Sequence, residues 1–193
     1  MLRPLHDVPE PEVFDPKEVF TFYGLAAYSG QVLEKGLVNL VAVQHTDGVS
    51  ITRSQFDTLF DRFDSSTFGQ LVREARARIQ IPPGTEALLA EALKKRNRLV
   101  HDFFADNATA FMTDSGCVKM IAELRDLVDL FQRADREAEK LWLPIAACRG
   151  LTEERVDQIA AKMERDFLAT VDVKASASAD RLRRPLSGDV RPL

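Results

Sequence analysis

Apolar residues recur at three- and four-residue steps over most of the chain, which is the spacing of one face of an α-helix. The first such stretch starts at Asp15-Pro16, an N-cap residue followed by a residue suited to the first helical position, and continues to about Gln44. Three glycines interrupt it at six-residue spacing: Gly24, Gly30 and Gly36. Each costs about 1 kcal/mol relative to alanine, which predicts close approach of another helix or, alternatively, a bend.

The same periodicity predicts two helices in the middle of the chain. One spans residues 68–79, and the sequence Pro82-Pro83-Gly84 breaks the chain after it. Thr85 is expected to be the N-cap of the next helix, which continues to about Ala105.

The longest periodic stretch follows, from Cys117 to Trp142, and its two adjoining apolar stripes predict a helix contacted from two sides. Pro144 is expected to end or kink it. A short helix is expected around residues 55–63, and a further amphipathic segment is marked by Val156, Ile159, Met163 and Phe167. No strand-like alternation is present. The predicted fold class is therefore all-α, a bundle of about five to six helices with two long antiparallel helices.

Composition shifts at both ends predict the domain limits. Four of the nine prolines fall within residues 1–16, which predicts an extended N-terminal arm over residues 1–14. Residues 15–170 are expected to form a single helical domain. Residues 171–193 lack periodicity and are expected to be a disordered basic tail, solvated or in contact with RNA or an acidic partner.

The charge balance excludes one class of protein. With 26 basic and 30 acidic residues the net charge is −4, which excludes a protein that coats nucleic acid through bulk positive charge. Neither a secretory signal nor an apolar run of membrane-spanning length is found, so we expect a cytoplasmic protein with no membrane partner. Cys117 and Cys148 are expected to be small buried core residues.

Standard cofactor and metal motifs are absent from the sequence. There is no phosphate-cradling loop, no dinucleotide-binding glycine pattern and no zinc-binding helix of the His-Glu-x-x-His type. Of the three histidines, His6 lies in the predicted arm, so a three-histidine metal site is not expected. We therefore predict no cofactor and no metal ligand, and only His101 lies inside a strongly predicted helix.

One segment, residues 94–104, concentrates positive charge on an otherwise acidic chain. Four of five consecutive residues are basic, and His101 follows within one turn; the basic residues are Lys94, Lys95, Arg96 and Arg98. A solvated basic face with His101 half-packed against the core is the structural interpretation. Proton transfer next to a phosphate site is the functional one, because the histidine side chain is suited to proton transfer near neutral pH.

The segment Arg96-Asn97-Arg98-Leu99-Val100-His101 resembles the signature of the HEPN superfamily, a family of nucleotide-binding proteins from higher eukaryotes and prokaryotes. In that family an arginine, usually followed by a polar residue, precedes a histidine near the end of a helix in an all-α bundle. The hydrophobic pair Leu99-Val100 and the following Asp102-Phe103-Phe104 strengthen the resemblance. The helices over residues 15–143 correspond to the helical core of the family.

The resemblance implies a metal-independent endoribonuclease of a toxin–antitoxin or phage-defence system, which cleaves RNA through its 2′-hydroxyl. It implies that His101 is the general acid or base, that Arg96 stabilises the charge of the transition state, and that Asn97 orients His101 or the phosphate. The basic residues expected to bind RNA phosphates are Lys94, Lys95 and Arg98. It also implies a homodimer and, as partners, a cognate antitoxin or a nucleotidyltransferase.

Helix geometry complicates this assignment. At roughly 100° per residue, Arg96 and His101 point about 140° apart, whereas Lys94, Asn97 and His101 form a stripe on one face. The long arginine side chain can reach round the helix, a kink can intervene, or a second copy of the chain can complete the site.

Two other functions remain open. The chain can be a non-catalytic, dimeric HEPN-like module that binds a partner protein or a nucleotide. It can also be a regulator similar to the mannitol-repressor group, which has a comparable Arg-Asn…His segment, although no helix-turn-helix with a basic recognition face is visible.

Overall fold

The structure is a computed structural model, and it describes residues 8–45, 54, 58, 61–63, 66–148, 150, 154–155, 157–158 and 161–170. These residues contain helices and no strand, which confirms the all-α fold class. The chain divides into two compact units, Met1–Arg149 and Gly150–Leu193, and the predicted domain of residues 15–170 spans this division. The predicted tail, the first half of the predicted arm and most of the expected 55–63 helix lie outside the described residues.

Helix α1, Pro16–Gln44, has the predicted bounds. The Asp15 side chain caps it by accepting a hydrogen bond from the backbone N–H of Glu18 at 2.8 Å. Two of its three glycines lie where helix α6 (Asp114–Cys148) approaches closely. A Cβ at position 30 would stand 3.7 Å from the Phe131 ring, and one at position 36 would stand 2.5 Å from Oδ1 of Asp135. Close helix packing therefore explains Gly36, whereas a Cβ at position 30 would make only ordinary van der Waals contacts.

Helices α3, Phe68–Arg78, and α4, Pro83–His101, follow. A capping box between Thr67 and Gln70 begins α3. The predicted N-cap of α4 was wrong: the helix begins at Pro83 after Pro82, because proline is suited to an initial helical position, and Thr85 lies in the first turn. Thr85 instead donates a hydrogen bond to Glu137 at 3.5 Å.

Helix α4 also ends earlier than predicted, at His101 rather than about Ala105. The backbone turns at Asp102, whose N–H donates to the Arg98 carbonyl at 2.9 Å, and the short helix α5 (Phe103–Asp106) follows in a new direction. The turn buries the Phe103 ring, which is 1% exposed and packs against Tyr23. Burial of this aromatic ring accounts for the change of direction.

Helix α6 follows the 3-10 helix η1 (Ala110–Met112) and continues through Pro144, so the proline does not end it. Both predicted apolar stripes are buried except for Leu141, which is half-buried, and α6 packs against α1, α4 and η1. Cys117 is buried as expected, but Cys148 is exposed, which corrects that prediction. No helix in the described part of the chain combines the length and apolarity needed to span a bilayer.

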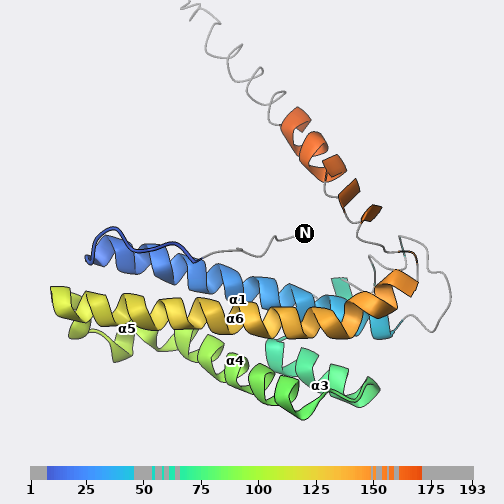
Figure 1. Cartoon of the computed structure of the whole chain (residues 1–193), viewed down its shortest axis with the longest axis horizontal. Helices are drawn as coiled ribbons and strands as arrows, with labels where there is room; N and C mark the ends of the chain where they lie inside the picture. Colours follow the sequence, from blue (N-terminus) through green and yellow to red (C-terminus); the bar gives the residue numbers. More distant parts are fainter. Residues whose placement is uncertain are drawn as a thin grey trace, which may run out of the picture. The chain divides into compact units, whose positions relative to one another are not determined.

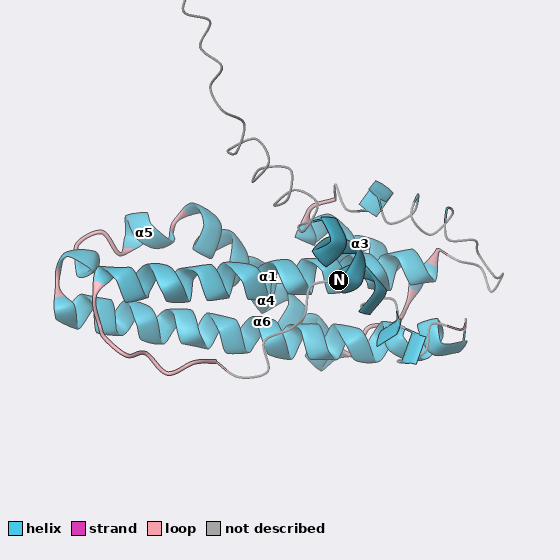
Figure 2. Cartoon of the chain, turned by 90° about the horizontal axis from the view of Figure 1, so that it is seen from above, coloured by secondary structure: helices cyan, strands magenta, loops and turns pink. Residues whose placement is uncertain are grey.

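The two long helices, α1 and α6, lie side by side and run parallel, not antiparallel as predicted (Figures 1 and 2). Gly30 lies near Phe131 and Gly36 near Asp135, so residue numbers rise together along the two helices. Helix α4 runs the opposite way, since Thr85 meets Glu137 whereas Arg98 meets Glu123. The chain returns along α4 before α6 begins, which leaves α6 in the direction of α1.

Candidate nucleic-acid interface on helix α4

The outer face of α4 carries an exposed stripe of three predicted site residues, Lys94, Asn97 and His101, which we call the α4 stripe. Their i, i+3, i+7 spacing places them on one side of the helix, as the sequence predicts. His101 is the last residue of α4, directly before the turn at Asp102. The side chains of Asn97 and His101 make no hydrogen bond or ion pair with another described residue. The stripe therefore presents a cation, an amide and an imidazole to solvent.

Arg96 points in a different direction, toward α1. Its Nη2 lies 2.7 Å from Oε1 of Glu34, and the two side chains are only 28% and 22% exposed. The arginine stem lies beside Gly30 of α1, with its Cγ 3.6 Å from where a Cβ would stand. The guanidinium is therefore held between two helices, on the inner side of α4.

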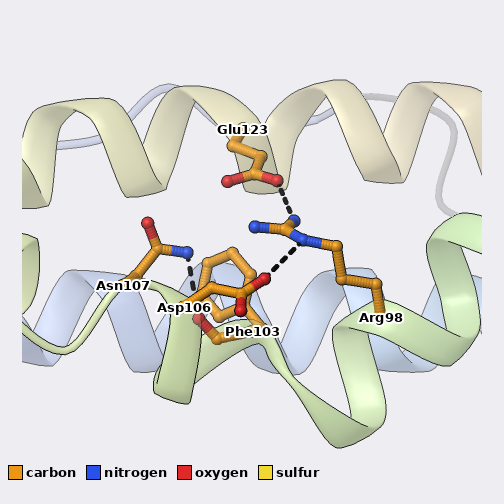
Figure 3. Close-up of polar contacts among 5 residues, drawn as sticks. All are labelled: Arg98, Phe103, Asp106, Asn107 and Glu123. Atoms are coloured by element: carbon orange, nitrogen blue, oxygen red, sulfur yellow. Dashed lines mark hydrogen bonds and ion pairs between the residues drawn. The ribbon is translucent and has the colours of Figure 1, made fainter.

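Arg98 forms a second interhelical contact, on the side of α4 that faces α6 (Figure 3). Its Nε lies 2.8 Å from Oδ2 of Asp106, and its Nη1 donates to Oε1 of Glu123. Burial alone would lower the pKa of Arg98, but the hydrogen bonds and charges of Glu123 and Asp106 outweigh it and raise the pKa above its ordinary value. Arg98 thus links α4, α5 and α6.

The structure predicts that Arg98 contributes to stability. Arg98→Met should lower the free energy of unfolding by about 1–2 kcal/mol, a range reduced for the partial exposure of its partners. Lys94→Met is the matched control, because that side chain is exposed and should change stability by no more than about 0.5 kcal/mol. Urea unfolding of both variants measures this difference; equal effects would contradict the structural role.

The six predicted site residues therefore do not converge in a single chain. Lys94, Asn97 and His101 lie together, Lys95 is half-buried, and the two arginines face other helices. The helix geometry that separates Arg96 from His101 in the sequence persists in the fold. One chain presents the imidazole outward and the motif arginine inward.

The residues that hold the arginines were missed in the sequence. Glu34 lies on α1 and Glu123 on α6, far from the motif along the chain, and the carboxylates of an acidic protein offer no signal that selects these two. Asp106 follows Arg98 by eight residues, a spacing that a continuous helix would not bring into contact. Only the turn after His101 places it there.

Two cavities of the described part of the chain are lined by residues other than those of the α4 stripe. A cavity of about 600 Å³ lies between the start of α4 and the second half of α6, and one of about 300 Å³ lies between α1 and α3, bordered by Glu34. Among the described residues, no His, Cys, Asp and Glu side chains are grouped as metal ligands.

No protein-family model, curated protein or solved structure matches the chain.

Proposed function

We propose that this protein is a metal-independent endoribonuclease of a toxin–antitoxin or phage-defence system, acting on cytoplasmic RNA through His101, Asn97 and Arg96. The observation that carries the proposal is the α4 stripe, because it exposes an imidazole one turn from an amide and beside cationic side chains. An imidazole can move the proton of the 2′-hydroxyl or of the leaving 5′-oxygen. Lys94 and Lys95 supply positive charge for the phosphates, while Arg98 is committed to the bundle.

A homodimer forms part of this proposal. Arg96 and His101 point to different sides of α4, so a second copy of the chain is a source for the missing half of the site. A cognate antitoxin or a nucleotidyltransferase partner would cover the exposed stripe. Cleavage of RNA through its 2′-hydroxyl needs an acid, a base and a cation next to the phosphate.

His101→Ala tests the proposal. RNA cleavage by the purified protein should fall by at least about 100-fold, since the substitution removes a general acid–base group. Thermal unfolding should not change, because the His101 side chain is exposed. Lys119→Ala, an exposed cation on α6, is the control and should keep its activity.

The outcome that would reject the proposal is equally specific. If the wild-type protein were no more toxic to cells than the His101→Ala variant, and the pure protein cleaved no cellular RNA, the endoribonuclease assignment should be dropped.

A second candidate, a non-catalytic HEPN-like dimeric module that binds a partner protein or a nucleotide, is favoured by the ion pairs of Arg96 and Arg98. Both guanidinium groups join helices within the bundle. This candidate predicts that His101→Ala disrupts dimers or lowers the melting temperature while no RNA cleavage is observed with any variant.

A further inference from the structure

The motif arginine and a carboxylate of α1 form a close pair in the folded chain. Nη2 of Arg96 lies 2.7 Å from Oε1 of Glu34. A carboxylate and a phosphate offer the same kind of acceptor to a guanidinium, namely negatively charged oxygens. Glu34 therefore occupies the group that the proposed function assigns to an RNA phosphate.

Arg96 and His101 point to different sides of α4 in the folded chain. His101 faces solvent from the outer side of α4, whereas Arg96 bonds Glu34 on the inner side. The arginine stem lies beside Gly30 of α1 in this position. A phosphate bound at His101 can meet the same guanidinium only after Arg96 has left Glu34.

We propose that Glu34 is an autoinhibitory residue, which competes with the RNA phosphate for Arg96 and holds the endoribonuclease site in an inactive arrangement. This inference rests on the proposed function. RNA binding shifts Arg96 from the carboxylate to the phosphate, so the ion pair must break each time the site is assembled. Its strength then sets the apparent affinity for RNA.

The surroundings of Glu34 allow this exchange. A single contact between Arg96 and Glu34 joins the pair, and neither side chain is fully buried. Glu34 also borders the cavity of about 300 Å³ between α1 and α3, together with Gln31, Val38 and Ser66. The released carboxylate can turn into this space and be solvated, which lowers the cost of separating the two charges.

The test compares affinities for a short, mixed-sequence single-stranded oligonucleotide with 2′-O-methyl groups, which the protein can bind but cannot cleave. Glu34→Asp retracts the carboxylate by one methylene and keeps the net charge, and Glu34→Gln removes the charge. Fluorescence anisotropy should show that both variants bind about tenfold more tightly than the wild type. The salt dependence should steepen by about 0.7 in slope, as for one added phosphate contact.

Glu86→Gln is the matched control. Glu86 pairs with Arg76 at 2.9 Å between α4 and α3, so its substitution makes the same charge change and breaks another interhelical pair. It should tighten binding far less than Glu34→Gln does. Adding Arg96→Gln to Glu34→Gln should abolish the gain, and thermal unfolding confirms that each variant is folded.

The results separate this inference from the proposed function. If Glu34→Asp and Glu34→Gln bind the oligonucleotide no more tightly than the wild type, or more weakly, Glu34 is not a competitor and the inference is overturned. Equal cleavage of an ordinary RNA by the wild type and by His101→Ala contradicts the endoribonuclease instead. The affinity comparison still decides the role of Glu34 in that case.

Discussion

Between about pH 5 and about pH 8, the wild-type protein is expected to lose about 2.5 kcal/mol of unfolding free energy relative to its Asp135→Asn variant. Asp135 is 5% exposed on α6, and its Oδ1 lies against α1 at Gly36. Burial raises its pKa from 3.8 to about 7; the charge of Glu139 adds to this shift, and that of Arg136 opposes it. The carboxyl of Asp135 therefore holds its proton in the folded state over a range where the unfolded chain has lost it.

The direction of the effect follows from this difference. Below about pH 4 the carboxyl is protonated in both states and contributes no pH dependence. As the pH rises toward 7, Asp135 ionises in the unfolded state first, which stabilises the unfolded state and lowers the unfolding free energy. Above about pH 7 the folded state also carries the charge, so the unfolding free energy stops falling. The Asn variant cannot ionise, so it escapes the whole loss, up to about 4 kcal/mol.

Urea unfolding of both proteins at the two pH values measures the change. Asp129→Asn is a suitable control, because that side chain is exposed and pairs with Arg133 on the surface of the same helix. Its stability relative to the wild type should vary little with pH by comparison. A difference between wild type and Asp135→Asn that is the same at both pH values would show that Asp135 does not titrate in this range.

Gly116→Ala is expected to lower the unfolding free energy by about 3 kcal/mol. Gly116 lies in the first turn of α6, where a Cβ would clash with the carbonyl oxygen of Ala110 in η1. Because the obstructing atoms belong to the backbone, a side-chain rotation cannot relieve the clash. Either η1 or the start of α6 must move.

Gly24→Ala provides the opposite control. Among the described residues, no atom outside the neighbouring backbone of α1 lies within 4 Å of a Cβ at position 24, and the residue is in the interior of α1. The substitution should therefore stabilise the protein by about 1 kcal/mol through helix propensity. Thermal and urea unfolding of the two variants should give shifts of opposite sign; a Gly116→Ala variant as stable as the wild type would mean that η1 does not pack as described.

A helix end was predicted correctly where residues next to it fix its position, and incorrectly where tertiary packing does. Asp15 and Pro16 act within one turn of the start of α1, so local chemistry was sufficient to place it. The end of α4 was predicted too late, because the apolar pattern continues through Phe103 and Phe104 although the backbone turns at Asp102. Phe103 enters the core after the turn. Periodicity does not distinguish an apolar residue that continues a helix from one that is buried beyond its end.

The candidate site divides in the same way. The helical fold and the shared face of Lys94, Asn97 and His101 could be predicted from the sequence, because both depend on backbone geometry over a few residues. The parallel direction of α1 and α6, and the pairing of Arg96 with Glu34 and of Arg98 with Glu123 and Asp106, arise only from the packing of the helices in the folded chain. These outcomes depend on which distant helices pack together, and helical periodicity shows that a face is buried without showing what buries it.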